Sequence, residues 1–171
     1  CTDAIMMCCQ YLGVREATIP TRTYLSVPQS IMNAGSKVKL KDYQWKGIYQ
    51  LEPHPIYDAA KRFTSDMYIP GTYMCLSFHH KKTLKIGKGG MILTDDADAV
   101  KWFKAARYEG RDHVADDIDI CGWNAYMTPE QAARGLTLLQ TLPKHNDDQL
   151  EEPQYRDLRT IPLFMNCETV E

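Results

Sequence analysis

Residues 73–90 read YMCLSFHHKKTLKIGKGG, which places an apolar run directly before a loop rich in lysine and glycine. The run at 73–79 predicts a buried strand. Lys81 and Lys82 follow the end of that strand, and a further strand is predicted at 91–94. Because ligands of parallel sheets bind beyond the carboxyl ends of the strands, this loop is a candidate functional site.

Strands and helices alternate on both sides of this stretch. Apolar periodicity, helix caps, and glycine or proline stop signals define each element. The alternation predicts an α/β fold with a mainly parallel sheet and helices on both faces. Strands are expected at 14–20, 37–41, 56–58, 73–79 and 91–94, and helices at 4–12, 24–34, 97–108 and 129–142.

Local signals predict how three of the helices begin. Thr2 or Asp3 is expected to cap the first helix, and Asp96 is expected to cap the helix at 97–108. Thr128 and Gln131 form a capping-box pattern at the start of the last helix. These polar residues each precede an apolar periodic run, so the helix boundaries are well marked in the sequence.

Other segments carry weaker signals. The alternation of residues 37–41 is typical of an edge strand, whereas residues 42–55 show no clear periodicity and are expected to be a connection. His79 and His80 are expected to be adjacent strand residues, so their side chains should point to opposite faces. No metal site is therefore predicted there.

The composition excludes several classes of function. With 44% hydrophobic and 25% charged residues, the chain is typical of a soluble globular domain. A net charge of −2 and scattered basic residues argue against nucleic-acid binding. No apolar run is long enough for a bilayer and nothing near the start resembles a signal peptide, so a cytoplasmic protein with no membrane partner is expected. The six cysteines have no C-x-x-C spacing and are expected to be reduced, with Cys8 and Cys9 buried.

Two motifs give the lysine loop a chemical meaning. Residues 77–90 are similar to S-F-H-x-x-K-x-L-x-x-G-E-G-G, and residues 57–60 are similar to E-D-A-A. Both patterns belong to the DegT/DnrJ/EryC1/StrS family of sugar aminotransferases that depend on pyridoxal 5′-phosphate (PLP), which the chain resembles. The resemblance implies the fold type I large domain, with Lys82 rather than Lys81 as the catalytic lysine that binds PLP. It also implies that Asp58 pairs with the pyridine nitrogen, which keeps the ring able to accept electrons.

Taken alone, these residues have ordinary alternatives. Lys82 by itself would be a solvated loop lysine, and Asp58 a turn or cap acid. The order in which the family motifs occur along the chain favours the functional roles for both residues.

Three more segments follow the family pattern in the same order. Thr2 lies in a segment similar to the phosphate-binding turn, at a predicted helix N-terminus that favours an anion. Tyr24 matches an aromatic residue that stacks on the cofactor ring, and Ser77 is a further cofactor-binding candidate. Asn124, in a segment similar to G-Y-N-x-R-M-x-x-x-Q-A-A, matches a residue that reaches the phosphate of the neighbouring subunit. The resemblance therefore implies a homodimer with shared sites.

The chain departs from the family pattern in places that concern the substrates. Lys61 stands where the family usually has Gln or His close to the phenolic oxygen of PLP, so it is also a cofactor-binding candidate. Lys88 replaces a glutamate, and Tyr126 replaces an arginine. These changes affect substrate handling more than cofactor capture.

Length is the larger departure. Residues 42–55 replace a strand and helices of the family, and the small C-terminal domain is largely missing. We expect a PLP-binding core at 1–142 and a short C-terminal tail at 143–171. Because residues 155–162 resemble the family's closing segment, an internal deletion is favoured over simple truncation, and the start at Cys1 suggests that something preceded it.

The resemblance implies two functional hypotheses. The first is an aminotransferase that moves an amino group from an amino-acid donor, glutamate in the family, to a nucleotide-linked keto-sugar. Lys82 argues against the family's dehydratase branch, which has histidine at this position. The alternative is a non-catalytic or weakly active relic that keeps PLP binding, which the shortened length and Lys61 and Lys88 favour.

Overall fold

The computed structural model of the protein describes residues 1–111, 117–149 and 155–170. Helices and strands alternate along these ranges, so the α/β fold that the sequence predicts is confirmed. The helices are α1 (Thr2–Tyr11), α2 (Ser26–Asn33), α3 (Ala97–Ala106) and α4 (Pro129–Leu139). The strands are β1 (Glu16–Pro20), β2 (Lys37–Lys41), β3 (Tyr49–Gln50), β4 (Ile56–Asp58), β5 (Tyr73–Ser77), β6 (Gly90–Leu93) and β7 (Glu168–Val170). The short 3-10 helices η1 (Leu158–Thr160) and η2 (Pro162–Phe164) precede β7.

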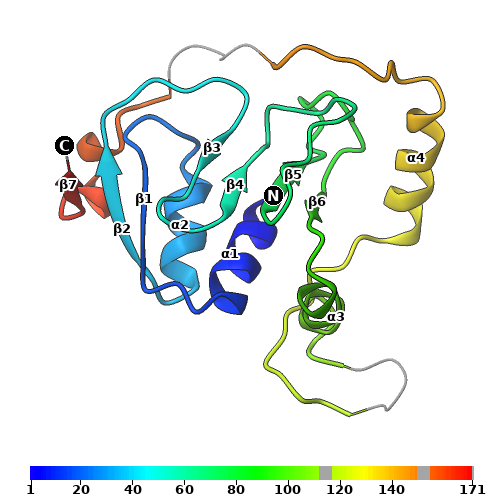
Figure 1. The fold of residues 1–171 in the computed structure, drawn as a ribbon, viewed down its shortest axis with the longest axis horizontal. Helices are drawn as coiled ribbons and strands as arrows, with labels where there is room; N and C mark the ends of the chain where they lie inside the picture. The colour runs from blue at the N-terminus through cyan, green and yellow to red at the C-terminus, as the bar shows by residue number, and fades with distance from the viewer. Residues whose placement is uncertain (112–116, 150–154, 171) are drawn as a thin grey trace.

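The strands form two sheets, which lie next to each other (Figure 1). One sheet has the order β1-β2-β7 and all its strands are parallel. The other has the order β3-β4-β5-β6, in which β4 and β5 are parallel and the two outer strands are antiparallel to their neighbours. A single antiparallel bridge between Thr18 and Glu52 joins the first sheet to the segment after β3.

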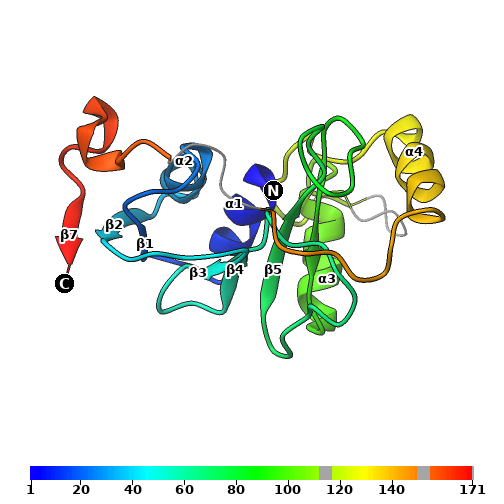
Figure 2. The ribbon, with the colours of Figure 1, turned by 90° about the horizontal axis from the view of Figure 1, so that it is seen from above.

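The side chains of β5 divide the core between two faces. Tyr73 and Cys75 pack into the larger apolar cluster, which also contains buried residues of α1 and α3. Met74 and Leu76 pack into a second cluster, which includes apolar residues from the start and end of the α4 region. Successive strand residues point to opposite faces, so residues of α1 and α3 pack on one face of β5, and Leu138 of α4 packs on the cluster at the other face. Figure 2 shows α1 between α2 and α3, with α4 at the far end.

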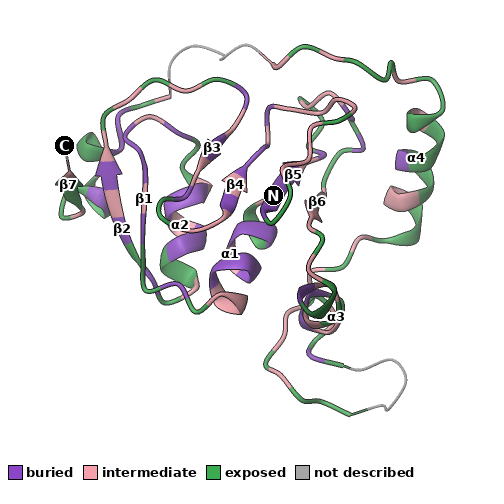
Figure 3. Cartoon of the chain, in the orientation of Figure 1, coloured by how far each residue is buried: buried purple, intermediate pink, exposed green. Residues whose placement is uncertain are grey.

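Burial differs sharply between the helices (Figure 3). Half of the residues of α1 are buried, including Cys8 and Cys9 as predicted, because the helix contacts α2, α3 and three strands of the second sheet. An apolar sequence on nearly all sides of a helix is typical of such a position. By contrast, α4 buries only Gly135 and exposes Leu136 and Leu139. No helix in the described part of the chain is long and apolar enough to cross a bilayer.

Two of the three predicted helix caps are confirmed. Asp96 accepts hydrogen bonds from the backbone N–H groups of Asp98 and Ala99, and Thr128 forms the predicted capping box. The prediction for α1 is wrong, because the N-cap is Cys1 and its side chain makes no capping bond. Thr2 already lies inside the first turn, where its hydroxyl donates to Ser26 Oγ at 2.9 Å.

Three other local predictions are also wrong. Residues 37–41 form an inner strand, because residues 168–170 of β7 pair with residues 39–41. The stretch 42–55 contains β3, which pairs with β4. Strand β5 ends before His79 and His80, so strand alternation does not apply to them, and their ring centroids lie only 3.9 Å apart. In each case pairing between distant segments, or the point where pairing stops, decides the local structure.

The described part of the C-terminal tail packs on the core. Leu158 and Phe164 are almost completely buried and belong to the larger apolar cluster. The tail thus returns from α4 at one end of the molecule to β2 at the other (Figure 1). Residues 150–154 and 171 of the predicted tail lie outside the described residues.

Candidate active site

The site is centred on Asp58, the last residue of β4. Its carboxylate is 5% exposed. Oδ2 accepts a hydrogen bond from the hydroxyl of Tyr49 at 3.0 Å, and Oδ1 accepts one from the backbone N–H of Ala60 at 2.9 Å. The thiol of Cys1 at the start of α1 lies 3.6 Å from Oδ1. A buried carboxylate at the carboxyl end of a central strand is the usual position for a ligand-binding group in an α/β sheet.

Burial and hydrogen bonding act on Asp58 in opposite directions. Burial raises the pKa of this carboxyl above its usual value, whereas the N–H of Ala60, the hydroxyl of Tyr49 and the charge of Lys82 lower it. The burial effect is the largest, so the net pKa is raised. A cationic group that enters the site would stabilise the ionised carboxylate.

Lys82 lies in the loop after β5 and its charge reaches Asp58. Its side chain is half-buried, and its backbone N–H donates to the carbonyl of His79 at 2.8 Å. The positive charge of Lys82 helps to lower the pKa of both Asp58 and His79. Lys81 is exposed, and its carbonyl accepts a hydrogen bond from Gln149. The structure therefore brings together the two residues that the sequence motifs single out.

The N-termini of two helices meet beside this carboxylate. Thr2 of α1 donates its hydroxyl to Ser26, the first residue of α2, and Ser30 donates to the carbonyl of Thr2 at 2.9 Å. Ser77 pairs with Gly90 across β5 and β6, and Gly90 packs against the backbone of Cys1. The free N–H groups and dipole at the start of a helix favour an anion. Thr2 and Ser77 thus lie where a phosphate could bind.

Lys61 takes part in a group of aromatic rings. Its side chain is 7% exposed, and Nζ lies 4.9 Å from the ring centroid of Tyr155 and 5.9 Å from that of Trp45. These distances are within the range of cation–π attraction. The rings of Trp45 and Tyr155 stack at 6.2 Å with an interplanar angle of 12°. Tyr24, 55% exposed, meets Tyr155 edge-on at 6.3 Å.

Asn124 lies in a different part of the structure. Its side chain is exposed and donates to Glu109 Oε1 at 3.3 Å, and its backbone bridges to Tyr108. Tyr126, two residues later, packs edge-on against Tyr108. These contacts hold Asn124 beside the C-terminal end of α3, whereas its predicted role is at the site of another subunit.

Sequence analysis missed three residues of the site. Tyr49 binds Asp58, Trp45 packs on Tyr49 at 4.7 Å, and Tyr155 stacks on Trp45. The signal that could have found Tyr49 is the pair of prolines at 53 and 55, which marks a turn between two short strands. For Tyr155 there is no such signal, because the aromatic rings it packs against, those of Tyr24 and Trp45, lie more than one hundred residues away along the chain.

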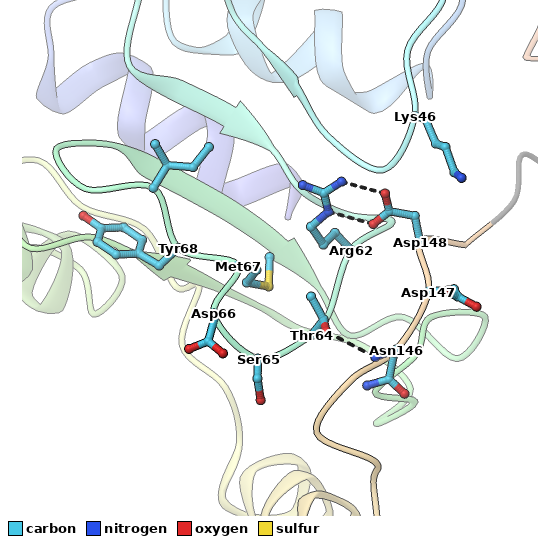
Figure 4. A pocket seen from close by; sticks show the side chains of 11 residues that line it. Lys46, Arg62, Thr64, Ser65, Asp66, Met67, Tyr68, Asn146, Asp147 and Asp148 are labelled. Carbon is cyan, nitrogen blue, oxygen red and sulfur yellow. Dashed lines mark hydrogen bonds and ion pairs between the residues drawn. The ribbon is translucent and has the colours of Figure 1, made fainter.

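A surface hollow lies between the segment after β4 and the tail, and neither Asp58 nor Lys82 lines it. Its volume is about 870 Å³. Arg62 forms a two-point ion pair with Asp148 there, with Nε–Oδ1 and Nη2–Oδ2 distances of 2.7 and 2.6 Å (Figure 4). Thr64 accepts a hydrogen bond from the backbone of Asn146. These contacts attach the tail to the segment after β4. The hollow is lined by Lys46, Arg62, Thr64, Ser65, Asp66, Met67, Tyr68, Ile69, Asn146, Asp147 and Asp148.

Comparison with known families decides the relationship. The model of the DegT/DnrJ/EryC1/StrS aminotransferase family matches residues 69–169, more than half of the chain. The chain belongs to this family. The matched range includes Ser77, Lys82 and Asn124, whereas Thr2, Tyr24, Asp58 and Lys61 precede it. No curated protein matches the chain.

Solved structures of aminotransferases share the fold. An aminotransferase from Psychrobacter cryohalolentis superposes with a TM-score of 0.67 at 18% identity, over 81% of this chain and 50% of that one. A Streptococcus pneumoniae protein assigned as a sugar aminotransferase, in its PLP form, gives 0.66 at 17% identity, over 83% and 53%. Helicobacter pylori PseC, an aminotransferase involved in the biosynthesis of pseudoaminic acid, gives 0.68 at 15% identity, over 83% and 52%. The chain thus spans about half the length of the aminotransferase structures that it matches.

Proposed function

We propose that this member of the DegT family acts as a PLP-dependent sugar aminotransferase. The observation that carries the proposal is the buried carboxylate of Asp58, which lies within electrostatic reach of Lys82 and beside the N-terminus of α1. PLP needs an amine, a carboxylate and an anion-binding helix end in one place. A relative with the same fold was solved in a PLP form, which supports the same cofactor here.

The residues present fit this cofactor. Lys82 would hold it covalently and Asp58 would pair with its ring nitrogen. Thr2 and Ser77, near the start of α1, would bind the phosphate. Tyr24, exposed at the rim, would lie on the ring face, and Lys61 would lie near the phenolic oxygen. These six assignments follow the family resemblance and remain proposals.

The chemistry follows from the roles of two side chains. Bound PLP supplies a ring that accepts the electron pair released when the donor amino acid loses its Cα proton. Asp58 keeps the ring nitrogen protonated, because a buried carboxylate beside a pyridinium stabilises the positive charge. Lys82 Nζ would hold the cofactor, and the same amine would move the proton at Cα of the donor as a general base and acid.

We also propose the substrates and the assembly that the family pattern implies. The donor is an amino acid, glutamate in the first instance, and the acceptor is a nucleotide-linked keto-sugar. The Streptococcus pneumoniae protein of the same fold is assigned as a sugar aminotransferase, which supports a sugar acceptor here. The protein would work in the cytoplasm as a homodimer in which Asn124 serves the partner's phosphate. Residues 1–142 would form the PLP-binding core and residues 143–171 its tail.

Absorbance spectroscopy tests the cofactor assignment. Wild-type protein mixed with PLP should develop the yellow band of lysine-linked PLP, and Lys82→Ala should abolish it. Lys81→Ala is the matched control, because Lys81 is the exposed neighbour and its loss should leave the band intact. Borohydride reduction and peptide mapping should place the label on Lys82. A label on Lys81, or no band in the wild-type protein, would refute the assignment.

Two half-reactions test turnover and separate an enzyme from a relic. Excess glutamate should convert the yellow form to the pyridoxamine form, and a nucleotide-linked keto-sugar should then restore the yellow band. A protein that binds PLP through Lys82 but completes neither conversion would be the relic. Each step can be followed in a single turnover, so slow chemistry is still measurable.

A further inference from the structure

Strand β3 brings a buried tyrosine to the carboxylate of Asp58. In the antiparallel pairing of β3 and β4, Tyr49 stands opposite Asp58. The Tyr49 side chain is 4% exposed, and its hydroxyl lies 3.0 Å from Asp58 Oδ2 and 2.7 Å from Thr23 Oγ1. Two short hydrogen bonds from one buried hydroxyl fix both its position and its direction.

We propose that Tyr49 is a positioning residue that holds Asp58 ionised and oriented for the cofactor nitrogen. This inference rests on the proposed function. The family resemblance gives the segment 42–55 no cofactor role, yet in this chain it supplies the group that binds Asp58. Tyr49 acts through Asp58 and has no predicted contact with the substrate.

The direction of the hydrogen bonds follows from the number of protons. An ionised carboxylate only accepts, so the single hydroxyl proton of Tyr49 goes to Asp58. Thr23 must then donate its own proton to the oxygen of Tyr49. The result is a directed chain from Thr23 through Tyr49 to Asp58. Hydrogen bonds to a charged group are roughly twice as strong as neutral ones, so this chain favours the ionised form.

The ring of Tyr49 is itself held in place. Trp45 packs against it with a centroid distance of 4.7 Å, and the indole N–H of Trp45 donates to the carbonyl of Arg22 at 2.9 Å. The ring of Tyr155 stacks in turn on that of Trp45. A buried ring packed in this way has little freedom to move, so the hydroxyl of Tyr49 stays aimed at Asp58.

Other charged or titratable groups also face Asp58. They come from the start of α1, from β5, and from the loop after β5. Each influences the ionisation of Asp58 or is influenced by it, so a test must change one of them alone. These groups are the amino and thiol groups of Cys1, the thiol of Cys75 and the ammonium of Lys82.

The test compares two tyrosines on neighbouring strands in protein without PLP. Tyr49→Phe removes the hydroxyl and keeps the ring. Tyr57→Phe is the matched control, because Tyr57 adjoins Asp58 in β4 but donates to Gln50. Carboxyl carbon NMR gives the pKa of Asp58, and the signal is assigned by its absence in Asp58→Asn.

We expect Tyr49→Phe to raise the pKa of Asp58 by roughly one to two units, the size expected for the loss of one charge-assisted hydrogen bond. Tyr57→Phe should leave it unchanged. Thr23→Val, which removes the donor to Tyr49, should raise it by a smaller amount and serves if Tyr49→Phe fails to fold. An unchanged Asp58 pKa in a folded Tyr49→Phe or Thr23→Val variant would overturn the proposal.

A second readout separates this inference from the proposed function. The acid limb of the pH profile for PLP binding should move upward in Tyr49→Phe by the same amount as the pKa of Asp58. If Tyr49 had only a structural role, the variant would bind PLP more weakly at all pH values and the acid limb would not move. That result would contradict the proposed positioning role. Failure of the wild-type protein to bind PLP would refute the proposed function, whereas the NMR comparison would still decide the role of Tyr49.

Discussion

At the scale of single residues, the buried carboxylate of Asp58 makes stability depend on pH. Burial raises its folded-state pKa above the usual value of 3.8. Between that value and the raised pKa, the folded protein keeps a proton that the unfolded chain has lost. The folded state then binds more protons, so the free energy of unfolding falls as pH rises through this interval. Above the raised pKa the loss is complete and constant.

Asp58→Asn should remove this pH dependence in protein without PLP. An amide keeps the shape but carries no charge, so the variant gains stability relative to wild type as pH rises from about 4 to neutrality. The gain should be about 1.4 kcal/mol for each unit by which the folded-state pKa is raised. Urea unfolding at a series of pH values measures it. Asp117→Asn, at an exposed position, is the control and should show no such trend.

At the scale of single residues, the family motifs single out Asp58 for the ring nitrogen of PLP and Lys82 for the covalent link. In the structure the charge of Lys82 acts on Asp58, and the roles of both residues toward PLP stay predictions. Tyr49 could not be predicted in this way, because its role depends on the pairing of β3 with β4. Strand β3 has only two residues, which is too short for a recognisable strand pattern in the sequence. Lys61 was predicted as a cofactor contact, and its packing against Trp45 and Tyr155 depends on a tail that folds back over the core.

At the scale of elements, replacing glycine with alanine should have opposite effects on stability at two positions with different surroundings. Gly135 lies inside α4, and a methyl group there would make an ordinary contact with Ile86 at 3.4 Å. Gly90 begins β6, and a methyl group there would collide with the backbones of Cys1 and Leu76. A backbone neighbour cannot move aside as a flexible side chain can, so the second site has no room.

Gly135→Ala should therefore stabilise the protein and Gly90→Ala should destabilise it. The first change lowers the conformational entropy of the unfolded chain in a helix interior and should add about 0.5–1 kcal/mol. The second should cost about 1–3 kcal/mol, as overpacking does. Denaturant unfolding of the two variants measures both effects. A Gly90→Ala protein as stable as wild type would contradict the close approach of α1 to β6.

Element prediction succeeded where local chemistry decides the structure. The caps of α3 and α4 follow from the side chains of Asp96 and Thr128, which the sequence shows directly. The prediction that β2 is an edge strand failed, because its outer edge pairs with residues 168–170 of β7. Alternation along a strand reports burial of its two faces and carries no information about what pairs with its edge.

At the scale of the whole molecule, ion pairs attach the tail to the core. Arg159 binds both Asp42 and Asp157, and Arg22 also reaches Asp157. Arg62 and Asp148 make a second attachment near Lys61. Leu158 and Phe164 of the tail are also buried in the larger apolar cluster. The tail is therefore packed on the proposed core, and its separation from residues 1–142 as a distinct unit remains a proposal.

The proposed homodimer requires a surface on each chain that meets the other chain. Asn124 is exposed, and apolar side chains are exposed at Ile118, Tyr126, Leu136 and Leu139. Exposed apolar side chains can be covered when a second copy binds. If Asn124 serves the partner's phosphate, each site needs Lys82 from one chain and Asn124 from the other.

Mixing two defective variants tests this arrangement. Lys82→Ala alone should form no yellow band, and Asn124→Ala alone should bind PLP weakly. In a mixed dimer, the Asn124→Ala chain keeps Lys82 and receives Asn124 from its partner, so one complete site is restored. If the chains pair at random after joint refolding, about a quarter of all sites should regain wild-type affinity for PLP. Titration of the yellow band measures this fraction, with light scattering to confirm dimers. No recovery in a dimeric mixture would show that Asn124 does not act across subunits, and a monomer at micromolar concentration would exclude the shared site.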